Sequence, residues 1–422
     1  MQIGVYGSGY LATVVSACLA DLGTPVTCFD TDSERVKELA QGTVAFYEKN
    51  LSEIIRRNVR SSRLRYSTEV DSQAARSQIV FVAQDSARGL EQAAVRIAAV
   101  APAEAPIVIC TPSPVGTVAQ VERLIRARNL DHPVVSHPLF LTNGCAVEDF
   151  NWPDRVLLGT RSSQAVATIK ALYRPLVMRG VPVIVTNFET AELVREAGTA
   201  FVATKISFIN ELAALCERVN ADAKDLALAL GLDKRIAPRC LTPGVELGGA
   251  FVEADMDSLA MLASENGVSL RILAAARDVQ RGHAERVVEK IATAVHNLSD
   301  KRVGLLGLSF KPHTSSVAGS ASMALARELA SNGATVHAYD PVAMPEAERE
   351  LRDGVRYCES AYAAAEGTDA LVVGTGWPEF RALDFARLRR LVKRPIIVDT
   401  KNLLDCDRLR GLGFQYMGVG RA

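Results

Sequence analysis

The amino-acid sequence predicts an α/β protein with two doubly wound domains, joined by a long central helix and a helical middle domain. Over residues 1–187, short apolar runs alternate with amphipathic stretches, which is the pattern of βαβ units around a parallel sheet. Residues 189–219 contain no proline and carry apolar side chains at helical spacing, so they predict one long helix. A second alternating block begins at Lys301 and predicts the second α/β domain.

Each expected strand is a short apolar run that ends at a glycine, a polar residue or a turn. In the first block the expected strands are residues 2–6, 25–30, 78–83, 106–110, 133–136, 156–159 and 182–186. In the second block they are residues 303–307, 335–339, 371–374 and 395–399. Besides 189–219, the helical spacing of apolar residues predicts helices at 256–265, 269–297 and 320–332.

Length, charge and cysteine content restrict the class of protein. A chain of 422 residues favours two or three domains. Its 48 basic and 48 acidic residues cancel, so we expect no nucleic-acid partner. No 18-residue apolar segment stands out, so we expect no membrane span and no membrane partner. The eight cysteines form no CxxC pair, which argues against disulfides and a metal site and favours a cytoplasmic protein.

The first expected strand is followed by a glycine-rich turn typical of dinucleotide binding. In Gly7-Ser-Gly9-Tyr-Leu-Ala, the first glycine permits a tight turn and the second lets backbone N–H groups approach a pyrophosphate. Asp30 ends the second strand, where a carboxylate can bind a ribose 2′-hydroxyl and favours NAD over NADP. The alternative is a glycine turn that binds nothing. The candidate cofactor-binding residues are Gly7, Gly9, Tyr10, Leu11, Asp30 and Arg35.

Further motifs resemble the UDP-glucose/GDP-mannose dehydrogenase family. They are PVGT at 114–117, GCAVEDF at 144–150, PDRVLLG at 153–159, ATKISFINE at 203–211, GLSFKP at 307–312 and GVGR at 418–421. They follow the family's order along nearly the whole chain. The resemblance implies an NAD-binding Rossmann domain at 1–187, a central helical dimerisation domain at 188–298 and a C-terminal Rossmann-like nucleotide-sugar-binding domain at 299–422. It also implies a homodimer formed through the central helix.

The family's usual reaction oxidises a sugar alcohol to a carboxylate with two NAD, through a cysteine thiolate that adds to an aldehyde. Its catalytic segment GGSCFPKD falls on residues 248–255, where Phe251 stands in the place of the cysteine. Leu139 and Asn143 replace two glutamates, and Pro112 replaces a threonine. Arg195 and Thr199 replace the lysine and asparagine that stabilise an oxyanion. The resemblance therefore implies a changed active site.

Other positions of the family's site are retained. Asp255 keeps the place of the family's aspartate, and His137 is new at its position and could accept a proton. A histidine satisfied in the core or at its rim is the default interpretation of this residue. The candidate catalytic residues are Asp255, Arg195, Thr199 and His137. The candidate substrate-binding residues are Lys205, Asn210, Arg235, Gly248, Gly249, Phe310, Lys311 and Lys401. Their cations suit a diphosphate, or they form structural ion pairs instead.

Four functions follow from this pattern. The first is an NAD-dependent oxidoreductase without the catalytic cysteine, which carries out two-electron alcohol or carbonyl chemistry on a nucleotide sugar or a related phosphorylated or polyol substrate. The second is an epimerase or elimination enzyme that holds NAD tightly and causes no net redox change. The third is a non-catalytic homologue that regulates or scaffolds an active dehydrogenase. The fourth is a standard UDP-glucose 6-dehydrogenase. The sequence favours the first.

Overall fold

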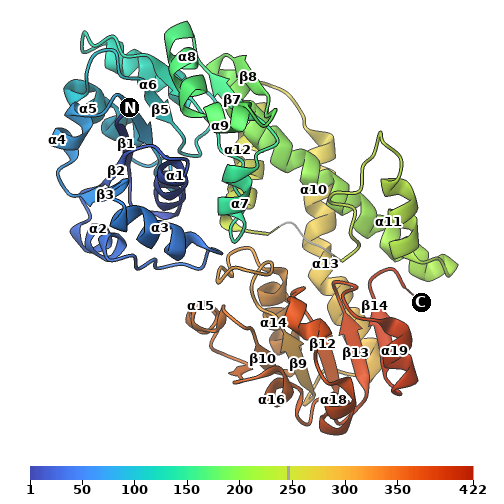
Figure 1. Cartoon of the computed structure of the whole chain (residues 1–422). Coiled ribbons are helices and arrows are strands. Elements are labelled where there is room, and N and C mark those ends of the chain that lie inside the picture. Colours follow the sequence, from blue (N-terminus) through green and yellow to red (C-terminus); the bar gives the residue numbers. More distant parts are fainter. Residues whose placement is uncertain (245–247, 422) are drawn as a thin grey trace. The chain divides into compact units, whose positions relative to one another are not determined.

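The computed structural model describes residues 1–244 and 248–421, and only the backbone of residues 250, 251 and 283. The chain divides into two compact units, Met1–Ala197 and Gly198–Ala422. Figure 1 follows both units along the chain from blue to red. The predicted α/β class with parallel sheets is confirmed, whereas the bounds of the three-domain division stay a prediction.

The first unit is built on a sheet with the strand order β3-β2-β1-β4-β5-β6-β7-β8. Its neighbouring strands are parallel except for β6 and β7, which meet antiparallel at Ser136 and Gly159. The chain reverses its direction of winding at β1, between β2 and β4, which is the switch point where doubly wound sheets bind ligands. The strands are β1 (Ile3–Tyr6), β2 (Val26–Phe29), β3 (Leu64–Ser67), β4 (Ile79–Val82), β5 (Ile107–Ile109), β6 (Val134–Ser136), β7 (Val156–Gly159) and β8 (Val183–Thr186).

Helices cover both faces of this sheet. On one face lie α1 (Tyr10–Asp21), α3 (Leu51–Arg60), α7 (Ala146–Asn151), α8 (Ser163–Leu172) and α9 (Arg174–Val177). The other face is covered by α4 (Val70–Ala75), α5 (Leu90–Val100) and α6 (Thr117–Arg126). The short helix α2 (Ser33–Ala40) follows β2. Successive residues of one strand point to opposite faces, so Phe81 joins the first core and Val82 the second.

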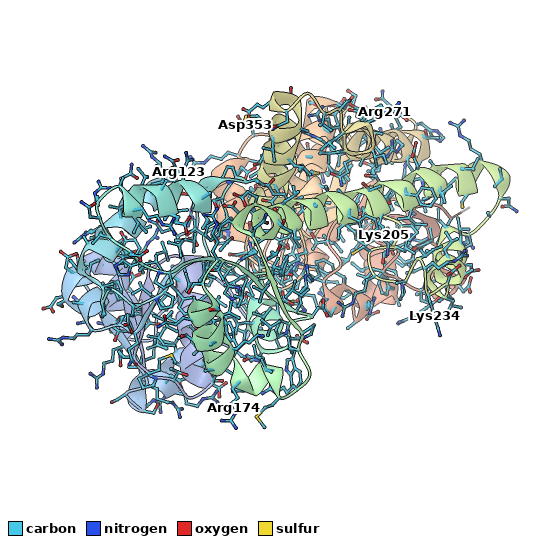
Figure 2. The ribbon with its side chains drawn as sticks, turned by 90° about the horizontal axis from the view of Figure 1, so that it is seen from above. Arg123, Arg174, Lys205, Lys234, Arg271 and Asp353 are labelled. Carbon is cyan, nitrogen blue, oxygen red and sulfur yellow. The ribbon has the colours of Figure 1, made fainter. Side chains whose placement is uncertain are left out.

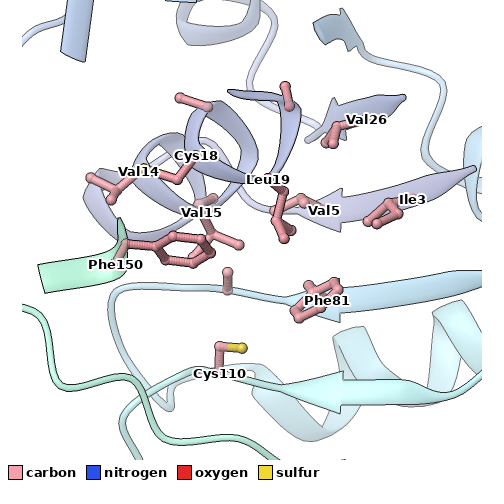
Figure 3. Close-up of a cluster of buried hydrophobic side chains, with 14 of the residues drawn as sticks. Ile3, Val5, Val14, Val15, Cys18, Leu19, Val26, Phe81, Cys110 and Phe150 are labelled. Atoms are coloured by element: carbon pink, nitrogen blue, oxygen red, sulfur yellow. The ribbon is translucent and has the colours of Figure 1, made fainter. Parts of the chain in front are cut away.

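Helix α1 is buried on nearly every side, as expected for a helix without a polar face. Residues 11–20 are all buried. In Figure 3, Val14, Val15 and Cys18 of α1 lie among the side chains of the neighbouring strands and of α7. This packing fixes the helix start beside the end of β1, where the glycine turn lies.

The second unit repeats the same topology, with the strand order β11-β10-β9-β12-β13-β14. All pairs are parallel. The strands are β9 (Arg302–Leu306), β10 (Thr335–Tyr339), β11 (Val355–Tyr357), β12 (Ala370–Val373), β13 (Ile396–Asp399) and β14 (Gln415–Gly418). Its helices are α14 (Ala321–Ser331), α15 (Met344–Glu350), α16 (Ala361–Ala365), α17 (Pro378–Arg381), α18 (Phe385–Leu391) and α19 (Cys406–Gly411). Two Rossmann-like sheets are therefore present, as predicted.

The helices between the sheets are α10 (Phe188–Val219), α11 (Ala223–Gly231), α12 (Ala250–Glu265) and α13 (Arg271–Val295). Ile291 and Val295 of α13 pack into the core of the second sheet. Shared packing explains why this helical part and the second sheet form one unit. Helix α10 begins in the first unit and ends in the second, over about 48 Å at ~1.5 Å per residue.

One sequence expectation needs correction. Helix α10 contains an 18-residue window with a mean hydropathy of 1.3 and few charges, so by length and composition alone it could cross a membrane. A core helix of a soluble protein can have the same length and composition, and 39% of this window is buried inside the chain. The apolar side chains of this helix include buried ones, such as Ile206 and Ile209, and exposed ones, such as Phe201 and Phe208.

Candidate cofactor and nucleotide-sugar sites

The turn between β1 and α1 has the geometry that the glycine motif predicts. Gly7 has a φ of +126°, and a Cβ atom there would lie 2.7 Å from the carbonyl oxygen of Ala83. Glycine is therefore required at this position both for its φ and for the close approach of β4. The turn leads directly into α1, whose first N–H groups point to the carboxyl end of the sheet.

Asp30 follows β2 at the same edge of the sheet. Its Oδ1 accepts hydrogen bonds from the Asp32 N–H at 3.2 Å and from the Thr31 hydroxyl at 3.3 Å. No residue in the described ranges donates to its Oδ2, which leaves an acceptor for a ribose hydroxyl. Arg35 does not pair with Asp30. Its side chain is exposed and lies 3.5 Å from Asp32.

The start of α1 differs from an open pyrophosphate site, because a carboxylate of the chain occupies it. Asp85 Oδ2 accepts the Tyr10 N–H at 3.0 Å, and its Oδ1 accepts the Leu11 N–H at 2.9 Å. A Cβ on Gly9 would overlap the same carboxylate. The glycine turn and Asp30 therefore fit a dinucleotide, whereas a pyrophosphate and the Asp85 carboxylate cannot occupy the start of α1 together.

The side chains of Tyr10 and Leu11 have structural roles, although both residues were predicted for the cofactor site. The Tyr10 hydroxyl donates to Glu48 Oε2 at 2.7 Å, and the same oxygen accepts the Gly144 N–H at 2.6 Å. Burial and the Glu48 bond raise the pKa of Tyr10. Leu11 belongs to the core. These two residues would contribute their backbone N–H groups only.

His137 is not placed as a proton acceptor for a substrate, so this prediction is wrong. It is 2% exposed, and its two ring nitrogens lie 2.9 Å from the Leu157 carbonyl and 3.0 Å from the Tyr173 hydroxyl. Burial lowers its pKa to about 4, so it stays neutral near pH 7. It is the histidine satisfied in the core that is the default interpretation from the sequence.

Asp255 and Thr199 come together where α12 packs on α10. The Thr199 hydroxyl donates to Asp255 Oδ2 at 3.1 Å, and Asp255 is only 6% exposed. Arg195 lies one helical turn before Thr199 on the same side of α10, 3.7 Å from Glu196. Phe251 lies one turn before Asp255 on α12, but its side chain is outside the described part of the chain.

Gly244 is held from two sides at the start of the glycine loop of the second unit. Its N–H donates to Asn210 Oδ1 at 2.8 Å, and its carbonyl accepts from Lys401 Nζ at 2.9 Å. Its φ of +84° and its contact with the Thr400 carbonyl exclude a side chain. Asn210 and Lys401 are therefore brought to one loop, as the predicted substrate site requires. The following residues, 245–247, lie outside the described part.

The end of this loop packs on Phe310. A Cβ on Gly248 would lie 2.6 Å from the Gly319 carbonyl and 3.1 Å from the Phe310 Cβ. Gly249 has a φ of +109° and faces the Phe310 ring. Lys311 Nζ lies 5.8 Å from the centre of that ring. Four predicted substrate residues therefore share one neighbourhood in the second unit.

Lys205 and Arg235 do not converge on this neighbourhood. Lys205 Nζ donates to three carbonyls, of Ile236, Ala237 and Arg239, at 2.9, 3.1 and 2.7 Å. An ammonium has three donors, so none remains for a phosphate, and the substrate role predicted for Lys205 is replaced by a structural one. Figure 2 labels Lys205 on α10. The Arg235 side chain is 88% exposed and pairs with Asp233 at 2.6 Å.

The cysteines do not supply an evident replacement thiolate. All eight are free. Burial raises the pKa of Cys28 to about 12 and raises those of Cys18 and Cys110 as well. Cys145 and Cys240 are half-buried.

Three acidic residues with clear roles were not predicted. Asp85 could have been found, because it follows β4 beside the switch point. Glu192 of α10 caps α6 with both oxygens, accepting the Gly116 N–H at 2.7 Å and the Val118 N–H at 2.9 Å. Nothing local in the sequence indicates that contact.

Asp340 fills the turn after β9, which corresponds to the glycine turn of the first unit. Its Oδ2 accepts the N–H groups of Leu308 and Ser309 at 2.8 and 3.0 Å and the indole N–H of Trp377 at 3.1 Å. Asp340 is 1% exposed. The second switch point is thus filled by protein groups, and the dinucleotide fingerprint belongs to the first unit.

Comparisons with known proteins also place the dinucleotide-binding domain in the first part of the chain. The NAD binding domain of the UDP-glucose/GDP-mannose dehydrogenase family matches residues 1–177, its central domain 189–281 and its UDP binding domain 304–406. UDP-glucose 6-dehydrogenase of Rhizobium meliloti is 37% identical over the full length of both chains. UDP-glucose 6-dehydrogenase TuaD of Bacillus subtilis is 33% identical and covers all of this chain and 93% of its own.

Solved structures give the same result. A UDP-glucose dehydrogenase from Pyrobaculum islandicum has a TM-score of 0.90 at 29% identity, over 100% of this chain and 98% of its own. A dehydrogenase from Pyrococcus horikoshii, at 22% identity and a TM-score of 0.84 over 100% of this chain and 99% of its own, shows the same fold. From the three matching domains and the full-length relatives, we conclude that this chain belongs to the UDP-glucose/GDP-mannose dehydrogenase family, with an NAD-binding and a UDP-binding domain.

Proposed function

We propose that this protein is an NAD-dependent oxidoreductase that carries out two-electron alcohol or carbonyl chemistry on a nucleotide sugar. The observation that carries the proposal is Phe251, which stands one turn before Asp255 in the segment where the family places its cysteine. A phenyl ring cannot form the thiohemiacetal that the second oxidation needs. The first oxidation, from alcohol to carbonyl, needs no thiolate. When bound, NAD supplies the hydride-accepting ring.

The chain's own contribution would come from α10 and α12. The Asp255 carboxylate, oriented by the Thr199 hydroxyl, is the candidate acceptor for the proton that an alcohol loses. Arg195, one turn away, is the candidate group for stabilising negative charge on the sugar oxygen. Neither the proton acceptor Asp255 nor the charge-stabilising Arg195 requires sulfur. These two residues therefore support an oxidation that stops at the carbonyl compound.

The nucleotide sugar would bind at the glycine loop of the second unit. Asn210 and Lys401 fix Gly244, and Phe310 supports Gly248 and Gly249, so the loop is held at both ends. The Lys311 ammonium and loop N–H groups suit a diphosphate. The UDP-binding domain of the family covers Phe310, Lys311 and Lys401 and supports this assignment.

The protein would act as a homodimer through α10. Phe201, Phe208 and Leu215 are spaced by seven residues and are 67%, 52% and 52% exposed. Seven residues are nearly two helical turns, so these side chains form one apolar stripe on the helix. A second copy of this helix, carrying the same stripe, is the occupant we propose.

The proposal is tested by incubating the purified protein with NAD and a panel of nucleotide sugars and measuring the product by mass spectrometry. We expect a product that has lost two hydrogen atoms and gained no oxygen. A uronic acid, which contains one oxygen more than the expected carbonyl compound, would refute two-electron chemistry. No turnover with any sugar or with the corresponding carbonyl compounds and NADH would refute the enzyme proposal altogether.

A further inference from the structure

The carboxylate of Asp85 occupies the start of α1 with both of its oxygens. Its bonds to the Tyr10 and Leu11 N–H groups, at 3.0 and 2.9 Å, satisfy the first two amides of the helix. The N-cap residue, Gly9, has no side chain that could accept these N–H groups. Asp85 comes from another element, the loop between β4 and α5, and therefore caps the helix through a tertiary contact.

These two N–H groups are also those that the glycine turn offers to a dinucleotide. In a doubly wound sheet the pyrophosphate sits at the N-terminus of the helix that follows the first strand, beside the switch point. In this chain that place lies between β1 and β4, and Asp85 is the third residue after the end of β4. A carboxylate and a pyrophosphate compete for the same donors and repel each other, so only one of them can occupy the site.

The loop of residues 85–88 can move away from the start of α1 without disturbing the core. Gln84 is anchored, because its N–H donates to Thr111 Oγ1 at 2.9 Å. Apart from a turn bond from the Leu90 N–H to the Ala87 carbonyl, the Asp85 carboxylate makes the only hydrogen bonds described for residues 85–88. Gly89, which has a φ of +77° and where a Cβ would meet only Gln92 Oε1 at 3.9 Å, ends the loop.

We infer that Asp85 is an internal competitor of NAD: the loop of residues 85–88 must release the start of α1 before the cofactor binds, and Asp85 thereby sets the affinity for NAD. The inference rests on the NAD-binding domain and not on the two-electron reaction proposed above. When only a fraction of the molecules has the loop released, the measured affinity is reduced by that fraction. Removing the competing carboxylate should restore the full affinity.

The direct test is calorimetric titration of the whole protein with NAD at constant ionic strength. Asp85→Asn keeps the shape of the side chain but removes its charge, and Asp85→Ala removes both oxygens. Glu104→Gln is the matched control, since Glu104 is exposed in the loop before β5, at the opposite end of the sheet. We expect both Asp85 variants to bind NAD at least about tenfold more tightly than the wild type, and the control to bind unchanged.

One further readout does not depend on turnover. Inorganic pyrophosphate should raise the melting temperature of Asp85→Ala more than that of the wild type. Equal affinities in wild type and variants, an equal gain in Glu104→Gln, or an equal thermal shift by pyrophosphate in wild type and Asp85→Ala would overturn the inference. A variant that binds NAD tightly but converts no sugar would sustain the inference and refute only the proposed function.

Discussion

Glu192 gives a quantitative prediction about pH, because its carboxylate is buried at a helix N-terminus. It is 4% exposed, and burial raises its pKa from 4.5 to about 7 despite the bonds from the Gly116 and Val118 N–H groups. A folded-state pKa above the unfolded value means that folding favours the protonated form. The stability from this group is fully present below pH 4.5 and is lost as the pH rises to about 7.

The loss amounts to about 3 kcal/mol at ~1.4 kcal/mol per unit of pKa. Glu192→Gln is neutral at every pH and should not lose this stability. Relative to the wild type, the variant should therefore gain roughly 2 to 3 kcal/mol between pH 5 and pH 8. Urea unfolding curves followed by circular dichroism at both pH values measure this, with the exposed Glu104→Gln as the control. A stability difference between Glu192→Gln and wild type that is the same at pH 5 and pH 8 would show that Glu192 is not buried as described.

Four further predictions concern the second unit and the helices. Asn210→Ala leaves the buried Gly244 N–H without its acceptor, which should lower the free energy of unfolding by about 1–3 kcal/mol. The variant should raise KM for the nucleotide sugar more than it lowers kcat. A larger effect on kcat than on KM would contradict a binding role. Asp340→Asn should lower the free energy of unfolding by at least about 2 kcal/mol in urea titrations, and an unchanged midpoint would count against the buried network. Phe251→Cys alone should form no uronic acid, since the family's carboxylate and threonine positions remain changed; detection of the acid by mass spectrometry would disprove this. Phe208→Glu should yield monomers in sedimentation experiments, and an intact dimer would exclude the apolar stripe as the interface.

The sequence predicts the buried strands well and the edge strands poorly. All seven strands expected in the first block and all four in the second are present, and ten of these eleven are runs of apolar residues covered on both faces. The exception is the edge strand β8, which is predicted because it is apolar although Ile184 and Val185 are exposed. The missed strands are Leu64–Ser67, Val355–Tyr357 and Gln415–Gly418, and all three lie at sheet edges. Their exposed positions carry polar side chains, so they lack the apolar pattern of a central strand.

The candidate site shows the same division between local and tertiary information. The glycine turn and Asp30 could be predicted, because a short local motif requires their conformation and position. A core position is the default interpretation for His137, but its partner Tyr173, 36 residues away, could not be identified from the sequence. The position of Asp85 beside β1 follows from the parallel pairing of β1 with β4 and could have been predicted, whereas its hydrogen bonds to the start of α1 could not.

The most direct test of the central claim is the number of NADH molecules formed for each nucleotide sugar consumed, with the sugar limiting and NAD in excess. The absence of a thiol at position 251 predicts one NADH for each sugar, with a carbonyl compound as the product. Two NADH for each sugar, or none with any sugar of the panel, would contradict the account.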